Sequence, residues 1–356
     1  MDYTFQAILQ CHRILYPGME PQDYCKLAYQ SEFGPAHLLS NPEAFFSSLT
    51  QEWSNLPASL PRLPPEPIGN GLYRFPLQGW PESAAPLLFQ LCRETARRHT
   101  GTRAGLLQRL SLLSRMKLPG LQEFLTSYTA RNCPPLHHSS VFRERYHPHY
   151  RLLLWEYASL FPLFLAIMQR YKEGNQLFVA IDGRCGSGKT HTAALLEQIF
   201  PCQVFHMDDF YLPPASRAAD WRKTPGGNMD FARLRTQVLS PAKAGKSVCY
   251  RPFHCRTGNL SPGKTVPPLP LTVLEGSYSH HPALDGYFDV RVFLTCSAQA
   301  QARRMKTREG QGFDAFAETW IPLEERYFAQ CSIPQHADLL LDTTEPVLAP
   351  ASGGSV

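Results

Sequence analysis

The sequence predicts an α/β fold in its second half, a parallel sheet flanked by helices, preceded by a mainly helical N-terminal domain. From about residue 175 onward, short apolar runs alternate with helical stretches, a pattern typical of parallel sheets with helices on both faces. A glycine-rich turn directly follows the first apolar run. The chain has 356 residues, enough for two domains, and 43% of them are apolar, which excludes a disordered protein.

The change in pattern along the chain predicts four segments. Prolines at 57, 61, 64, 65 and 67 mark a connection, residues 72–75 predict a short strand, and residues 87–116 predict two amphipathic helices separated near Gly101. The end of the chain is small and polar, which favours a flexible tail. We expect the N-terminal domain at 1–150, a connecting helix at 151–174, the α/β domain at 175–345 and the tail at 346–356.

The apolar stretch at residues 152–168 resembles a membrane span at first sight. It contains Glu156 and Pro162 and falls short of about 20 apolar residues. A charge and a helix breaker are costly in lipid. We therefore expect a buried helix here and no association with a membrane.

Five apolar runs are candidate strands of the parallel sheet. The first, residues 177–181, is apolar throughout, as in a strand buried on both faces. The others are at 204–205, 271–274, 290–294 and 339–341.

The turn after the first strand matches G-x-x-x-x-G-K-[ST] in full. Its glycines let successive backbone N–H groups point at phosphate oxygens, and the helix that follows adds the positive end of its dipole. Lys189 would reach the β- and γ-phosphates, and the Thr190 hydroxyl would bind Mg²⁺. The sequence thus predicts a P-loop NTPase sheet with ATP and Mg²⁺ as cofactors. The predicted nucleotide-binding residues are Gly183, Arg184, Cys185, Gly186, Ser187, Gly188, Lys189 and Thr190.

Two strand ends offer carboxylates. In open α/β sheets ligands bind beyond the carboxyl ends of the strands. Asp208, in the run VFHMDDFYLP, could accept a proton from an acceptor hydroxyl and lie near the metal. Glu275 ends an apolar strand, the expected place for an acid beside Mg²⁺ on the strand next to the P-loop strand.

A cationic helix follows the strand at 290–294. It carries Arg303, Arg304, Lys306 and Arg308, and one face of it could close over ATP. In phosphoryl transfer, a cation placed there stabilises charge on the moving group.

These residues together resemble the uridine kinase and phosphoribulokinase-like branch of P-loop kinases, which includes bacterial pantothenate kinases. The resemblance covers roughly residues 177–342. It is carried by the GRCGSGKT loop, MDDFY, NMD at 228–230, LEGSY at 274–278, RRMKTR, and Ala337 with Asp338 before the last strand.

The resemblance implies roles for single residues. Asp208 would be the general base, with Phe210 and Tyr211 near the acceptor. Glu275 would lie near Mg²⁺, and Asp230 would bind ribose. Arg304 and Arg308 would be the catalytic cations of the lid, acting with Lys189.

The chain departs from uridine kinases at residues 250–256. Those kinases carry a Tyr-Asp-Phe segment and a nearby His on a hairpin that meets the base, whereas this chain has YRPFHCR. Tyr250, Phe253 and His254 are therefore candidate acceptor-binding residues. A nucleoside is the first candidate acceptor, and pantothenate or a sugar acid such as glycerate is the alternative.

A different class of function is a regulator that binds a nucleotide and has no acceptor. Asp208 separates the two hypotheses, because a regulator needs no general base. In the N-terminal half, residues 31–37 (SEFGPAH), His137, His138 and Ser139 are candidates for a site. His147 and His149 are spaced poorly for a metal on a helix.

Charge and cysteine content limit the partners and the compartment. The formal net charge is +5, but Lys and Arg are scattered, which does not favour a nucleic-acid surface. Ten cysteines at irregular spacing, with no C-x-x-C pair, indicate reduced thiols in a cytoplasmic protein. We expect a small-molecule acceptor as the partner; the sequence leaves a homo-oligomer open.

Overall fold

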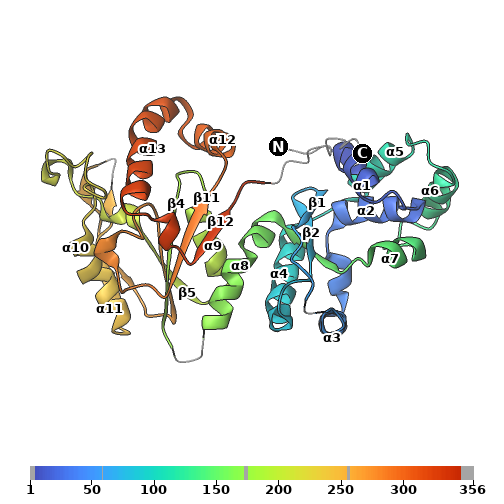
Figure 1. Cartoon of the computed structure of the whole chain (residues 1–356), viewed down its shortest axis with the longest axis horizontal. Coiled ribbons are helices and arrows are strands. Elements are labelled where there is room, and N and C mark those ends of the chain that lie inside the picture. The colour runs from blue at the N-terminus through green and yellow to red at the C-terminus, as the bar shows by residue number, and fades with distance from the viewer. Residues whose placement is uncertain (1–4, 58, 172–174, 255–256, 346–356) are drawn as a thin grey trace. The chain divides into compact units, whose positions relative to one another are not determined.

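The computed structural model describes residues 5–57, 59–171, 175–254 and 257–345 (Figure 1). These residues divide into two compact units, of which the first extends to Ala158 and the second is Ser159–Thr344. The predicted tail at 346–356 and the last three residues of the predicted connecting helix, 172–174, lie outside the described residues.

The first unit is mainly helical and contains one small antiparallel sheet. Its sheet has the order β1-β2-β3, and its core includes Ile8, Leu27, Ile68 and Leu106. The elements are α1 (Phe5–Leu15), α2 (Pro21–Phe33), α3 (Pro42–Ser54), β1 (Glu66–Gly69), β2 (Leu72–Pro76), α4 (Ala85–Arg98), α5 (Arg103–Leu113), α6 (Leu121–Ala130), α7 (Ser140–Tyr146) and β3 (Tyr150–Leu154).

The interruption between α4 and α5 has a local cause. The Thr102 hydroxyl accepts a hydrogen bond from the backbone N–H of Gly105 at 3.0 Å, which satisfies one of the free donors at the start of α5. The predicted strand at residues 72–75 is confirmed as β2.

The start of the predicted connecting helix forms a strand instead. Residues Tyr150–Leu154 pair antiparallel with β2, with Leu72 opposite Leu154 and Pro76 opposite Tyr150. The helix α8 is Trp155–Arg170 and contains Pro162. An apolar run of this kind suits a strand as well as a helix, and here the partner strand decides. Within the described ranges, no helix is long and apolar enough to cross a membrane.

The second unit contains a five-stranded parallel sheet of order β12-β11-β4-β10-β5, which confirms the predicted fold class and all five predicted strands. Two short antiparallel pairs, β6 with β9 and β7 with β8, lie outside the sheet. The strands are β4 (Leu177–Gly183), β5 (Cys202–His206), β6 (Val248–Tyr250), β7 (Phe253–His254), β8 (Asn259–Leu260), β9 (Lys264–Val266), β10 (Leu271–Glu275), β11 (Val290–Thr295) and β12 (Leu339–Asp342). The helices are α9 (Lys189–Ile199), α10 (Phe231–Leu234), α11 (Ser240–Lys243), α12 (Ala298–Glu309) and α13 (Phe313–Gln330).

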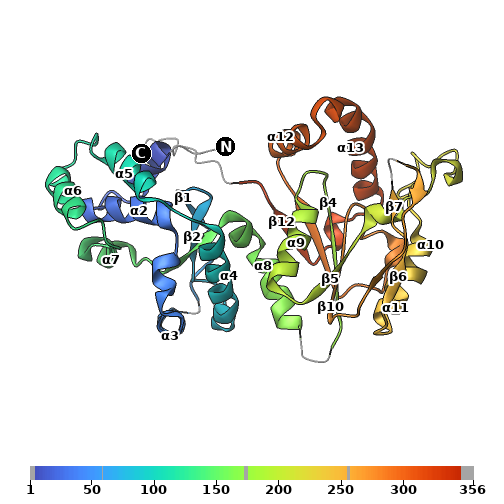
Figure 2. The ribbon, with the colours of Figure 1, turned by 180° about the vertical axis from the view of Figure 1, so that it is seen from behind.

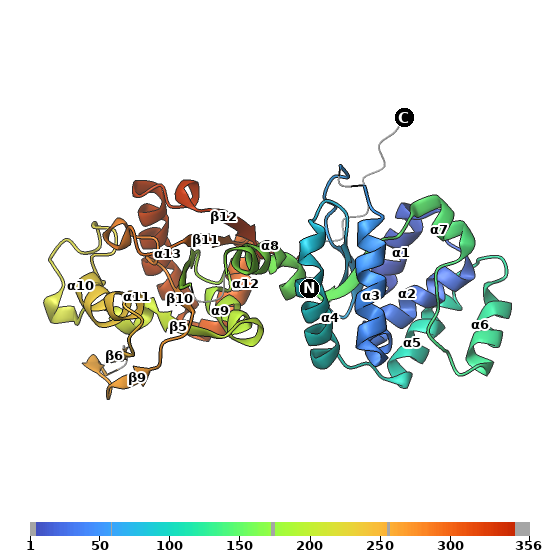
Figure 3. The same cartoon turned by 90° about the horizontal axis from the view of Figure 1, so that it is seen from below.

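Both faces of this sheet are covered, as its apolar strands require. On one face, strand residues such as Phe178, Phe205 and Leu274 pack with Leu239 of the α10–α11 segment and Tyr327 of α13. Figure 3 shows α8 and α9 on the other side of the strands from α10 and α11. In Figures 1 and 2, α12 and the start of α13 lie beyond the carboxyl ends of β4 and β11, and α13 continues onto the face where Tyr327 packs.

Candidate active site

The glycine-rich loop lies between the central strand β4 and the start of α9. Gly183 has φ +142°, and a Cβ there would lie 2.1 Å from the carbonyl oxygen of Leu294 on the neighbouring strand. Gly186 and Gly188 also have positive φ, +73° and +93°. The close approach and the backbone conformation explain why glycine occupies these positions.

Lys189 is the first residue of α9 and turns back over the loop. Its Nζ donates to the carbonyl oxygens of Gly183 at 2.6 Å and Arg184 at 3.1 Å. The ammonium group is thereby fixed above the loop, where phosphate oxygens would approach the helix N-terminus.

Glu275, at the end of β10, contacts two polar side chains. Its carboxylate accepts from the Thr190 hydroxyl, with the two oxygens 3.2 and 3.3 Å from Oγ1, and lies 2.6 Å from His206 Nδ1. The Glu275 side chain is 5% exposed. Hydrogen bonding to this carboxylate raises the pKa of His206 above its usual value.

The residues present fit Mg²⁺ bound together with a nucleotide. Magnesium is usually held by one or two carboxylates, waters and phosphate oxygens rather than by a complete protein cage. Thr190 and Glu275 supply two adjacent oxygen ligands for such a site. Among the residues that the structure describes, no group of three His, Cys, Asp or Glu side chains could hold a metal by itself.

Asp208 lies in the short 3₁₀ helix Met207–Phe210 directly after β5. Asp208 is exposed to solvent. Its carboxyl group is nevertheless surrounded by protein, and this partial burial, together with the charge of Glu275, raises the pKa of Asp208 above its usual value. Lys189, Arg308 and a hydrogen bond with Tyr211 act in the opposite direction. The carboxyl group of Asp208 therefore lies among the candidate phosphate-binding and metal-binding groups Lys189 and Glu275.

One cavity of about 820 Å³ brings these groups together. Its volume is in the range of small-molecule and cofactor sites. It is lined by the loop and its lysine, the two acids, cations of α12, and aromatic residues from several elements. The lining includes Cys185, Gly186, Gly188, Lys189, Thr190, Asp208, Tyr211, Arg217, Phe253, Glu275, Ser277, Arg304, Arg308, Phe316, Trp320 and Glu324.

The two predicted lid arginines both line this cavity, but they are held differently. Arg304 donates to the carbonyl oxygen of Gly186 at 3.0 Å and to the hydroxyl and carbonyl of Thr343. Arg308 is more exposed, pairs with Glu309 at 2.7 Å, and lies 5.4 Å from the centre of the Phe316 ring. Arg304 therefore anchors the loop, whereas Arg308 contacts residues of α12 and α13 at the cavity wall.

Other predicted residues lie away from the cavity. Phe210 is fully buried in the core and stacks on Tyr250, with ring centres 5.4 Å apart. The Tyr250 hydroxyl donates to Asp209 at 2.8 Å. Within the described chain, neither ring is part of the cavity wall, because the 3₁₀ turn directs Phe210 inward and Tyr211 outward.

Asp230, His254 and Arg184 have local partners. Asp230 caps α10 by accepting from the backbone N–H of Arg233 at 3.0 Å. His254 is exposed on β7. The Arg184 guanidinium pairs with Glu325 at 2.6 Å and donates to the Thr295 hydroxyl. Ser187 is buried within the loop.

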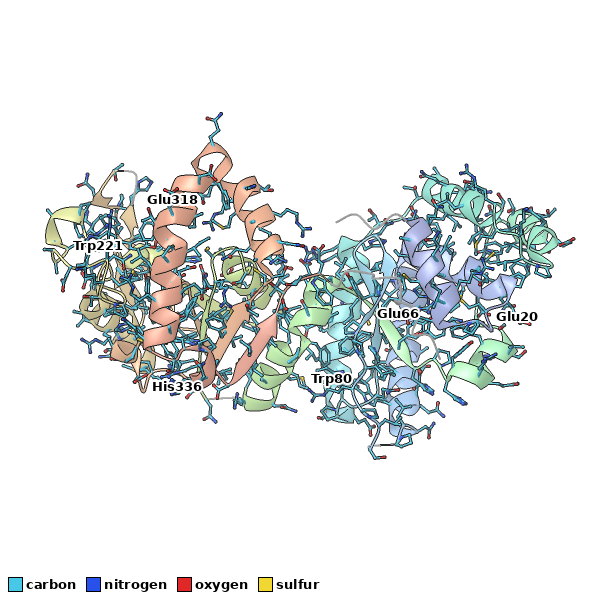
Figure 4. The ribbon with its side chains drawn as sticks, turned by 45° about the horizontal axis from the view of Figure 1, so that its top comes forward. Glu20, Glu66, Trp80, Trp221, Glu318 and His336 are labelled. Atoms are coloured by element: carbon cyan, nitrogen blue, oxygen red, sulfur yellow. The ribbon has the colours of Figure 1, made fainter. Side chains whose placement is uncertain are left out.

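The aromatic residues Phe316 and Trp320 were not predicted as part of the site. Trp320 lies 6.2 Å from the ring of Tyr211 and 6.5 Å from that of Trp221, which Figure 4 labels. Phe316, Trp320 and Glu324 are spaced four residues apart on α13 and therefore share one face of the helix. This spacing could have been used to predict from the sequence that these residues lie together at the site.

Comparisons with solved structures find similar proteins over about half of the chain. A possible uridine kinase from Bacillus stearothermophilus is 22% identical, with a TM-score of 0.42, and the match covers 51% of this chain and 96% of that one. A proposed fructose transport system kinase from Silicibacter sp. TM1040 is 24% identical, with a TM-score of 0.42, covering 52% and 98%. Deoxyadenosine kinase from M. mycoides is 14% identical, with a TM-score of 0.23, covering 47% and 91%. The sequence matches no protein-family model and no curated protein.

Proposed function

We propose that this chain transfers the γ-phosphoryl group of ATP to a hydroxyl group of a small molecule. The observation that carries the proposal is that Asp208 lines the same cavity as Lys189 and Thr190. Phosphoryl transfer needs positioning, charge stabilisation and a group that accepts the hydroxyl proton. A regulator that only binds a nucleotide has no use for an acid at this place.

One group of residues binds the nucleotide, and another acts on the acceptor and the transferred group. Lys189 and the loop N–H groups bind the phosphates, while Thr190 and Glu275 would hold Mg²⁺, which would neutralise phosphate charge. Asp208 accepts the proton of the attacking hydroxyl. Arg308 and the anchored Arg304 stabilise charge on the transferred group. The raised pKa of Asp208 makes it a stronger base than an ordinary aspartate.

The wall of the cavity favours a nucleoside as the acceptor. Tyr211, Phe253, Phe316 and Trp320 supply ring faces, on which a planar base stacks with about 1–3 kcal/mol per base. Pantothenate and sugar acids such as glycerate offer no such ring. Arg217 also lines the cavity and would suit an acid of this alternative class.

The decisive experiment measures ADP release with Mg-ATP and a panel of nucleosides, pantothenate and glycerate. We expect at least one nucleoside to raise turnover above the background ATPase rate, and mass spectrometry of the product to show one added phosphate. A panel in which no compound raises turnover would refute the kinase proposal.

Asp208→Asn tests the base directly. We expect ATP binding to be retained and transfer to fall by about 10²–10⁴-fold, the usual contribution of a general base. Asp209→Asn is the matched control, because Asp209 is the adjacent acid and instead accepts from Tyr250. Full activity in Asp208→Asn would remove Asp208 from this role.

A further inference from the structure

Glu324 of α13 contacts the phosphate-binding loop directly. Its Oε2 accepts a hydrogen bond from the backbone N–H of Cys185 at 2.8 Å. Its other oxygen accepts one from the Ser277 hydroxyl, in the turn after β10. The side chain is only 7% exposed and lines the cavity. A single carboxylate thus joins α13, the loop and the end of β10.

The N–H group that donates to Glu324 belongs to a glycine-rich loop of the kind that binds phosphate. Backbone N–H groups of such loops bind phosphate oxygens, and a carboxylate oxygen is an acceptor of the same charge and similar geometry. One N–H cannot bond fully to both, and two anions beside one donor repel each other. A phosphate group that reaches Cys185 must therefore displace Glu324 or bind against its charge.

The terminal phosphate of a triphosphate is the group in question. Transfer requires it to lie between the loop and the acceptor. Glu324 lies between the loop and the aromatic wall, because it bonds to Cys185 and shares a helix face with Trp320 and Phe316. A diphosphate lacks this terminal group, so it leaves the Glu324 contact in place.

We propose that Glu324 competes with the terminal phosphate of the nucleotide for the Cys185 N–H, and that its release couples triphosphate binding to the position of Trp320. The proposal depends on the proposed function only for the identity of the nucleotide. In the diphosphate state, α13 is held against the loop. In the triphosphate state, the Glu324 contact is broken, and the aromatic face of α13 adjusts to the acceptor.

Nucleotide affinities of Glu324→Gln test the competition. Glutamine keeps an oxygen acceptor for Cys185 and Ser277 but removes the charge. We expect the variant to bind a non-hydrolysable ATP analogue with Mg²⁺ at least about fivefold more tightly than the unmodified chain, a coupling of ordinary size. The Kd for ADP should stay within about twofold. Calorimetry on the full chain measures both.

Two further variants make the result specific. Glu318→Gln changes an exposed acid of the same helix, labelled in Figure 4, and should alter neither affinity. Ser277→Ala removes the hydroxyl that holds the other oxygen and should shift the ratio of the two affinities in the same direction by less. It also replaces Glu324→Gln as the test if that variant does not fold.

Trp320 fluorescence tests the coupling. The difference in emission between the unmodified chain and Trp320→Phe should change with the ATP analogue and stay constant with ADP. Equal tightening of both nucleotides in Glu324→Gln, weaker analogue binding, or an equal Trp320 response to both nucleotides would overturn the inference. These measurements need no phosphoryl transfer, so failure of every acceptor would refute the proposed function and leave the inference to be decided by the affinities.

Discussion

Asp208 has neighbours of both signs, and the balance between them sets its acidity. Burial by the surrounding protein and the charge of Glu275 raise its pKa, whereas Lys189 and Arg308 lower it. The net direction is upward. A general base works only when deprotonated, so activity should fall as the pH decreases through this raised pKa.

Arg308→Gln should therefore move the acid limb of the kcat/KM profile to higher pH. Removing the cation takes away a favourable interaction with the ionised carboxylate, which raises the pKa of Asp208 further. The pH profile of acceptor phosphorylation measures the shift. Arg303→Gln, an exposed arginine of α12 outside the cavity wall, is the control and should leave the limb in place. A limb that stays fixed in Arg308→Gln would show that another group limits the rate.

Neighbouring residues differ in how far the sequence could predict them. The loop and the acids Asp208 and Glu275 could be placed because each follows a strand that a local pattern identifies. Phe210 and Tyr211 are adjacent and similar, and the turn that buries one and exposes the other depends on packing against Tyr250. Trp320 and Glu324 could have been found by extending the helical spacing of α13.

At the level of elements, a strand is easier to predict when its own sequence pattern identifies it than when it depends on a partner strand far away in the sequence. The apolar runs of β4, β10 and β11 are buried on both faces, so their patterns alone indicate strands. The apolar run of β3 would suit a helix equally well. It forms a strand because it pairs with β2, whose residues 72–76 lie far away in the sequence. This pairing cannot be predicted from the sequence of residues 150–154 alone.

Gly183→Ala tests how tightly β4 and β11 constrain the loop. A Cβ 2.1 Å from the carbonyl oxygen of Leu294 requires the strands to separate. We expect a loss of more than about 3 kcal/mol in the stability of the second unit, in the range of severe substitutions. Gly312→Ala, where nothing lies within 4 Å of the added atom, should change it by less than about 0.5 kcal/mol. Urea unfolding followed by hydrogen exchange in β4 and β11 compares the two.

At the scale of the whole molecule, the first unit contains a buried polar network. The Asp23 carboxylate binds His138 at 2.8 Å and both the N–H and hydroxyl of Ser139. His138 contacts Tyr150, and Arg74 pairs with Glu66, labelled in Figure 4. His138 and Ser139, candidates from the sequence, thus have polar partners in the interior of the first unit.

This network makes the first unit sensitive to acid. Burial lowers the pKa of His138 to about 4, and also that of His12, which lies 3.2 Å from Glu66. Because these values lie below the unfolded value of about 6.5, the unfolded chain binds protons first as the pH falls. The contribution of each histidine to the free energy of unfolding is complete above about pH 6.5 and is lost between there and about pH 4. At pH 5 the loss is roughly 2 kcal/mol per histidine.

Hydrogen exchange at pH 7.5 and pH 5, corrected for intrinsic rates, should show lower protection in α1 and α7 at the lower pH. His138→Gln should reduce this pH dependence, because one titrating group is gone. The exposed His254→Gln is the control and should leave the dependence unchanged. Equal protection of the first unit at both pH values would contradict the expectation.

The position of β10 between β4 and β5 has a consequence for how the second unit folds. β4 and β5 are joined through α9 and are synthesised early, yet neither pairs with the other; both pair with β10, which begins at Leu271. Until that residue leaves the ribosome, β4 and β5 both lack the strand that lies between them in the complete sheet, where they are about 10 Å apart. The sheet, and with it the loop at Gly183, therefore forms late, through contacts of long sequence separation that slow folding.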